Sequence, residues 1–215
     1  MNNAMLKASL AELVGTFILT FIGGAAVVAA GGNVVIPALA HGLALLFIVY
    51  TYGHISGAHV NPAVTLGLLV GRQIEAMKAV AYWVAQFAGA ILAALLLSVI
   101  LGAGKVGETT GPLTTSSVWL AALFEAVMTF FLVSTVYQAA VYGKAGNLAG
   151  VAIGLTLGAS ILAGGTFTGA SLNPARTLGP ALVAGHLDYV LPYFVGILGG
   201  GALAGLVHGY FFKDA

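Results

Sequence analysis

Two eleven-residue segments of this chain are nearly identical and stand half a chain length apart. Residues 57–67 read GAHVNPAVTLG and residues 169–179 read GASLNPARTLG, so eight of eleven positions match at a constant offset of 112. Glu12 and Glu125 match at an offset of 113, in the apolar segments that begin the two halves. One Asn-Pro-Ala tripeptide would be weak evidence for a functional motif, but two copies in register are strong evidence. We therefore expect internal repeats over approximately residues 1–105 and 113–215.

Both halves are too apolar to fold in water. Hydrophobic residues make up 60% of the 215 positions and charged residues 6%, whereas soluble domains are about a quarter charged. The formal net charge of +1 also provides no basic patch for a nucleic acid, which excludes nucleic-acid partners. Six apolar blocks suited to crossing a bilayer lie at roughly 8–30, 37–55, 79–101, 117–142, 148–165 and 189–211.

Two further apolar segments, 56–70 and 166–183, are too short to span and too hydrophobic for a solvated loop. Such segments occur at membrane depth only when buried in protein or lining a water-filled cavity. Within them, Asn61 and Asn173 each stand directly before a proline. Since Asn is a good N-cap and proline suits the first helical position, each pair predicts the start of a re-entrant half-helix.

The predicted fold is an all-α membrane protein with six transmembrane helices and two re-entrant half-helices. Each half holds three spans, an odd number, so the halves should cross the membrane in opposite directions, as an inverted 3+3 repeat. The site is then expected near the midplane, where the broken segments meet. The whole chain, 1–215, is expected to be a single transmembrane channel domain.

The inverted arrangement points two half-helix N-termini at each other. Each carries roughly half a positive charge, which opposes cations. If the Asn61 and Asn173 oxygens cap the helices, their NH2 groups remain as donors facing the lumen. Two such donors can bind one water oxygen and prevent it from passing a proton. The alternative is that each Asn-Pro pair merely caps a buried helix.

These residues resemble the aquaporins (major intrinsic proteins), over nearly the whole chain. The matching segments are AELVGTF at 11–17, GHISGAHVNPAVT at 53–65 and GASLNPARTLGP at 169–180. The resemblance implies a homotetramer with one pore per subunit, in contact with membrane lipid, that conducts water passively and needs no cofactor. The pore motifs it implies are Asn61, Pro62 and Ala63, with Asn173, Pro174 and Ala175.

The resemblance also places a selectivity filter of four residues on the extracellular side: His41, Ile161, Ala170 and Arg176. Orthodox water channels usually carry an aromatic at the first position and His at the second. This chain departs from that pattern and is more similar to the vacuolar-membrane (tonoplast) aquaporins of plants, several of which are thought to pass ammonia. The alternatives are a buried, backbone-satisfied His41 and a snorkelling Arg176.

Glycerol-conducting relatives usually have an Asp directly after the Asn-Pro-Ala-Arg stretch and a basic residue four positions on. Here those positions hold Thr177 and Ala181, and Tyr193-Phe194 supplies an aromatic pair that glycerol channels usually lack. Water is therefore favoured over glycerol, and a glycerol facilitator stays an alternative.

Glu12 and Glu125 are intramembrane carboxyl groups, for which function is the default hypothesis. A proton relay would make the chain an ion- or proton-coupled secondary transporter. The resemblance instead implies structural carboxyls that accept hydrogen bonds from the re-entrant loops, and it places His59 in the cytoplasmic vestibule. We find no catalytic residues, no metal-ligand cluster and no cysteine in the sequence, so an enzyme is not expected.

Positive charges predict the orientation. With both termini in the cytoplasm, five basic residues lie inside and only Lys105 lies in an outer loop; the five are Lys7, Arg72, Lys78, Lys144 and Lys213. The short termini favour the cell membrane of a prokaryote, and the vacuolar membrane is the alternative.

Overall fold

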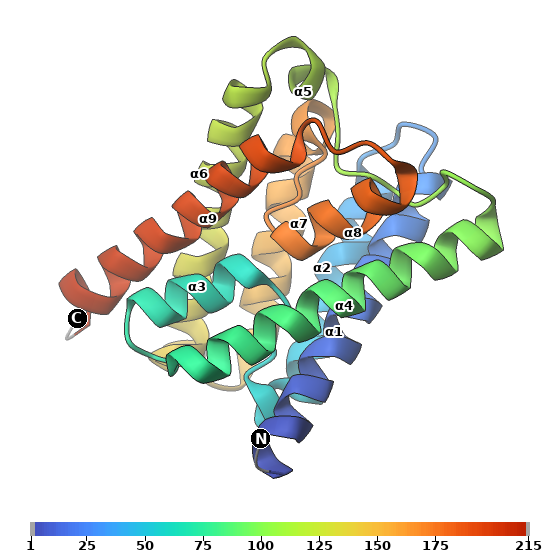
Figure 1. The fold of residues 1–215 in the computed structure, drawn as a ribbon. Helices are drawn as coiled ribbons and strands as arrows, with labels where there is room; N and C mark the ends of the chain where they lie inside the picture. The colour runs from blue at the N-terminus through green and yellow to red at the C-terminus, as the bar shows by residue number, and fades with distance from the viewer. Residues whose placement is uncertain (1–2, 214–215) are drawn as a thin grey trace.

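Long helices surround two short ones at the centre of the bundle (Figure 1). The computed structural model describes residues 3–213, so the ends of the expected 1–215 domain lie outside the described residues. Six helices are long and apolar enough to cross a membrane, which confirms the number of predicted spans. They are α1 (Asn3–Ala29), α2 (Val35–Ser56), α4 (Ala76–Leu101), α6 (Val118–Val136), α7 (Ala149–Thr168) and α9 (Val190–Leu206).

Both α6 and α9 continue for one turn as a π-helix, over Tyr137–Val141 and Val207–Phe211, and a 3-10 turn at Gly146–Leu148 precedes α7. The short helices α3 (Pro62–Val70) and α8 (Pro174–Ala184) begin at the two duplicated prolines, as the sequence predicts.

A further short helix, α5 (Pro112–Ser116), lies between the apolar blocks predicted at 79–101 and 117–142. Its first residue is a proline, whose fixed φ angle suits the first turn of a helix. Its Thr114 hydroxyl accepts a hydrogen bond from the Gly111 N–H (3.0 Å). Local capping therefore produces a helix that is too short to appear as an apolar block.

The two halves of the chain exchange their short helices. Within each half the first span packs on the last, α1 on α4 and α6 on α9, while α2 and α7 pack across the halves. Helix α3 packs on α9, and α8 packs on α4. Glycines permit these contacts: a β-carbon at Gly67 would lie 2.8 Å from the Gly201 oxygen, and one at Gly179 would lie 2.6 Å from the Ala90 oxygen.

The polarity of the molecule is the reverse of that of a soluble protein. Large apolar side chains on the long helices face outward, with Val99 81%, Met77 72% and Leu191 70% exposed. Glu12 and Glu125 are fully buried, at 0% exposure. An apolar exterior around a polar interior suits a bilayer, where lipid tails are the solvent.

Candidate pore

The two duplicated asparagines cap the short helices, as predicted. Asn61 Oδ1 accepts a hydrogen bond from the Ala63 N–H (2.8 Å). Asn173 Oδ1 accepts from the N–H groups of Ala175 (3.0 Å) and Arg176 (3.2 Å). Each cap satisfies main-chain donors that the first turn of a helix leaves without partners.

The side-chain nitrogens of the same asparagines reach across to the opposite half. Asn61 Nδ2 donates to the Leu172 carbonyl oxygen (2.8 Å), and Asn173 Nδ2 donates to that of Val60 (2.9 Å). The opposite loop therefore takes up one N–H of each NH2 group that the sequence analysis expected to face the lumen. An amide nitrogen carries two hydrogens, so one N–H of each asparagine remains for the lumen.

Both loops hold an unusual backbone just before their asparagines. Ala58 and Val60 have φ angles of 48° and 43°, and their counterparts Ala170 and Leu172 have 43° and 53°. Positive φ is rare outside glycine, and it is a genuine outlier for bulky or β-branched residues such as Leu172 and Val60. Such conformations persist only where surrounding contacts impose them.

Glu12 supplies those contacts in the first half. Its Oε1 accepts hydrogen bonds from the Ser56 hydroxyl (2.6 Å) and the His59 N–H (2.9 Å). Its Oε2 accepts from the Val60 N–H (2.6 Å) and from Gln86 Nε2 (2.8 Å).

Glu125 repeats the arrangement in the second half. It accepts from the Thr168 hydroxyl (2.7 Å), the Ser171 N–H (3.0 Å) and the Leu172 N–H (2.8 Å). Ser56 and Thr168, which the sequence analysis missed, are equivalent residues at the repeat offset of 112. That equivalence was the signal that could have identified them.

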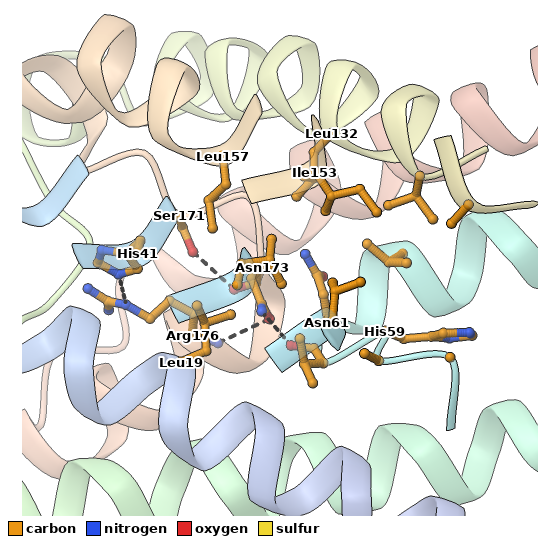
Figure 2. A pocket seen from close by; sticks show the side chains of 18 residues that line it. Leu19, His41, His59, Asn61, Leu132, Ile153, Leu157, Ser171, Asn173 and Arg176 are labelled. Atoms are coloured by element: carbon orange, nitrogen blue, oxygen red, sulfur yellow. Dashed lines mark hydrogen bonds between the residues drawn. The ribbon is translucent and has the colours of Figure 1, made fainter. Parts of the chain in front are cut away.

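A narrow cavity, called the channel below, lies beside these loops. Figure 2 shows the polar side chains in sequence along it: His41 and Arg176, then Asn173 and Asn61, then His59. The channel volume is 40 Å³, whereas one water molecule needs about 10–15 Å³ on the same measure. The aliphatic side chains of Leu132, Ile153 and Leu157 lie on the opposite side (Figure 2), and Leu45 and Val49 also line the channel.

His41 and Arg176, which are 135 positions apart, meet at one end of this channel. Arg176 Nε donates to His41 Nε2 (3.2 Å), and His41 Nδ1 lies 2.7 Å from the Pro37 carbonyl oxygen. A carbonyl only accepts, so Nδ1 carries the proton and Nε2 is the acceptor: the ring is neutral. Both residues are buried, at 6% and 2% exposure.

A wider outer vestibule of 350 Å³ adjoins this pair, and His41, Ile161 and Glu108 are among its lining residues. Ala170 is 4% exposed and belongs to the second loop, but it lines neither this vestibule nor the channel within the described residues. The structure thus joins His41 to Arg176, and Ile161 lines the vestibule that His41 also lines.

His59 lines the opposite end of the channel. Its Nδ1 lies 3.0 Å from the Thr65 hydroxyl oxygen, and its ring packs edge-on against Tyr82. These contacts fix the imidazole in the wall.

Comparisons with known proteins agree with this arrangement. The family model described as "Major intrinsic protein" matches residues 1–208. The chain is 44% identical over 219 residues to the probable aquaporin TIP1-2 of Oryza sativa subsp. japonica, covering 96% of this chain and 86% of that protein. It is 45% identical over 218 residues to aquaporin TIP1-1 of Zea mays, covering 94% and 86%. Its fold is similar to that of the aquaglyceroporin from Plasmodium falciparum, with a TM-score of 0.82, 24% identity and 97% of each chain covered.

Proposed function

The chain belongs to the major intrinsic protein family of membrane channels, and from that premise we propose that it is a passive water channel that excludes protons and ions. The observation that carries the proposal is the row of donors along a channel of 40 Å³. Arg176, Asn173 and Asn61 offer N–H groups on one side, and the facing wall is aliphatic. Water can follow such a row while larger solutes meet the walls.

The proton barrier is proposed to lie at the two asparagines. One amide hydrogen of Asn61 and one of Asn173 bind the opposite loop, which leaves one of each for a water oxygen. A water that accepts two hydrogen bonds directs its own hydrogens outward, so it cannot relay a proton through the centre. The N-terminal ends of α3 and α8 add positive potential against cations.

The filter proposed from the family is His41, Ile161, Ala170 and Arg176. The neutral His41 ring and the Arg176 guanidinium form its polar side. Ile161 and Ala170 are smaller or less polar than the residues of orthodox water channels, which leaves room for ammonia as a second neutral solute.

Neither alternative has comparable support. A coupled transporter would need a carboxyl group free to exchange protons, but Glu12 and Glu125 are fully buried and are occupied by the loops. The likeness to an aquaglyceroporin, at 24% identity, concerns the fold alone.

We also propose an inverted repeat of the two halves, cytoplasmic termini and assembly as a homotetramer. The named relatives are plant TIP aquaporins. They favour the vacuolar membrane over the prokaryotic cell membrane that the short termini suggested.

Stopped-flow measurements on proteoliposomes test the proposal, with water, ammonia and proton fluxes followed in parallel. We expect water flux well above that of empty vesicles and no added proton flux. The matched variants are Asn61→Asp and Asn173→Asp, which keep the capping oxygen but lose the NH2 group. They should admit protons. Absence of water flux in the wild-type protein would overturn the proposed function, and ammonia flux equal to that of empty vesicles would restrict it to water.

A further inference from the structure

Beyond the four filter positions, one acidic residue of a connecting loop lies in the vestibule that His41 also lines. Glu108 belongs to the connection between α4 and α5 and lines the outer vestibule together with His41. Its Oε2 lies 3.0 Å from His186 Nδ1, in a pair whose side chains are 18% and 66% exposed, respectively. Its Oε1 is buried and has no hydrogen-bond partner among the described residues.

Arg176 likewise has a buried polar atom without a hydrogen-bond partner among the described residues. Its Nε binds His41, but its Nη1 is buried and has no partner within residues 3–213. Burying a guanidinium nitrogen without a hydrogen bond is costly. Arg176 is only 2% exposed, so bulk solvent does not offset that cost.

Two carboxyl groups interact electrostatically with Arg176, Glu125 more strongly than Glu108. Glu125 is already occupied, because both of its oxygens accept hydrogen bonds from the second loop. Glu108 alone of the two has a buried oxygen to spare. Tyr189, which is 2% exposed, interacts electrostatically with both Glu108 and Arg176 and belongs to the same polar region.

The loop that carries Glu108 packs closely against two other segments of the protein. A β-carbon at Gly107, where φ is 68°, would lie 2.4 Å from the Gly24 oxygen of α1. A β-carbon at Gly169, directly before Ala170, would lie 2.6 Å from the Thr109 carbonyl carbon. Only glycine permits these approaches, and with them residues 107–109 are packed between α1 and the filter loop. Glu108 therefore has a fixed place beside the filter.

We infer that Glu108 is a positioning residue for Arg176, which it holds in the filter through water that bridges the carboxyl oxygen and the guanidinium. Buried water makes two to four such bonds to otherwise unpaired groups. His186 orients the carboxyl group from the outside. The inference rests on the proposed function, because Arg176 controls selectivity only if the channel conducts.

The test is a double-mutant cycle on the permeability of urea relative to water, measured in proteoliposomes. Glu108→Gln keeps the size of the side chain but removes its charge. Without the carboxyl group, Arg176 keeps its hydrogen bond to His41 but loses the water-mediated one, so it leaves the constriction for part of the time. We expect the ratio to rise about three- to tenfold, the usual net effect of losing one hydrogen bond. In an Arg176→Val background the same substitution should change nothing.

Two further variants complete the design. Asp188→Asn removes an exposed carboxyl group from the loop that carries His186 and should leave the ratio unchanged. His186→Ala breaks only the outer hydrogen bond and should raise the ratio less than Glu108→Gln does, so the inference remains testable if that variant folds poorly.

An unchanged ratio in both Glu108→Gln and His186→Ala would overturn the inference. An equal effect of Glu108→Gln in the Arg176→Val background would also overturn the inference, and so would an equal effect of Asp188→Asn. Either result would mean that negative charge at the channel entrance changes the ratio without acting through Arg176. Failure of the proposed function is distinguishable, because it appears as absent water flux in the wild-type protein.

Discussion

Asn61 donates a hydrogen bond from its Nδ2 to the carbonyl oxygen of Leu172, 2.8 Å away and 111 positions later in the chain. The bond from Asn173 to Val60 reciprocates it. Each half of the molecule therefore braces the strained loop of the other. The asparagines that cap the short helices also join the halves where the channel is lined from both.

Gly23 provides a test of the His41–Arg176 pair. A β-carbon at Gly23 would lie 2.0 Å from His41 Nε2, so Gly23→Ala must push the imidazole away from α1 and toward the channel. We expect water permeability per protein to fall about tenfold, which corresponds to roughly 1.4 kcal/mol of added barrier. Stopped-flow light scattering measures this water permeability.

The control is a second substitution that should compensate for the first. Adding His41→Ala to Gly23→Ala removes the displaced ring and should restore water flux. A double variant as slow as Gly23→Ala would show that the glycine acts on packing elsewhere in α1 and not through His41.

Glu12→Gln should destabilise the first loop. Whichever oxygen becomes an NH2 group, it faces N–H donors: His59 on one side, or Val60 and Gln86 on the other. Each buried donor left unpaired costs about 1–3 kcal/mol. Thermal unfolding in detergent should therefore occur at lower temperature than for Glu75→Gln, an exposed control. Equal unfolding temperatures would mean that the loop does not depend on Glu12.

Two adjacent glycines in α9 form a matched pair for testing helix packing. A β-carbon at Gly200 would lie 2.1 Å from the Ala126 oxygen of α6, whereas one at Gly199 would meet nothing within 4 Å. Gly200→Ala should lower the free energy of unfolding by about 1–3 kcal/mol through overpacking. Gly199→Ala should not lower it. Size-exclusion chromatography after heating compares the two, and equal losses would contradict a tight α6–α9 contact.

The chain has no cysteine, so mercurials should not block the wild-type pore by thiol attachment. An Ala170→Cys variant tests whether Ala170 belongs to the proposed filter, since it lines neither the channel nor the outer vestibule in the structure. As a filter residue, the cysteine should lose most of the water flux to a mercurial and regain it on addition of a thiol. Leu155→Cys, at a position 65% exposed on α7, should be insensitive. An Ala170→Cys variant that is not blocked would remove Ala170 from the filter.

Local signals made much of this fold predictable. The apolar blocks give the six long helices, and the prolines at positions 62 and 174 mark the starts of α3 and α8. The capping by Asn61 and Asn173 was predictable for the same reason, since an N-cap depends on residues two or three positions away.

Long-range contacts were not predictable. No local rule indicates that Asn61 binds Leu172, and a left-handed Val60 contradicts the preference of its residue type. Glu108 carries no motif either; its position beside Arg176 depends on the packing of residues 107–109 against two other segments.

The reciprocal bracing has a consequence for biosynthesis. Val60 emerges from the ribosome more than a hundred residues before Asn173, its partner in the brace. The first half can enter the bilayer, but its loop has neither the brace nor the second wall of the channel until α8 is in place. The water path is therefore complete only after the second half of the chain has folded against the first.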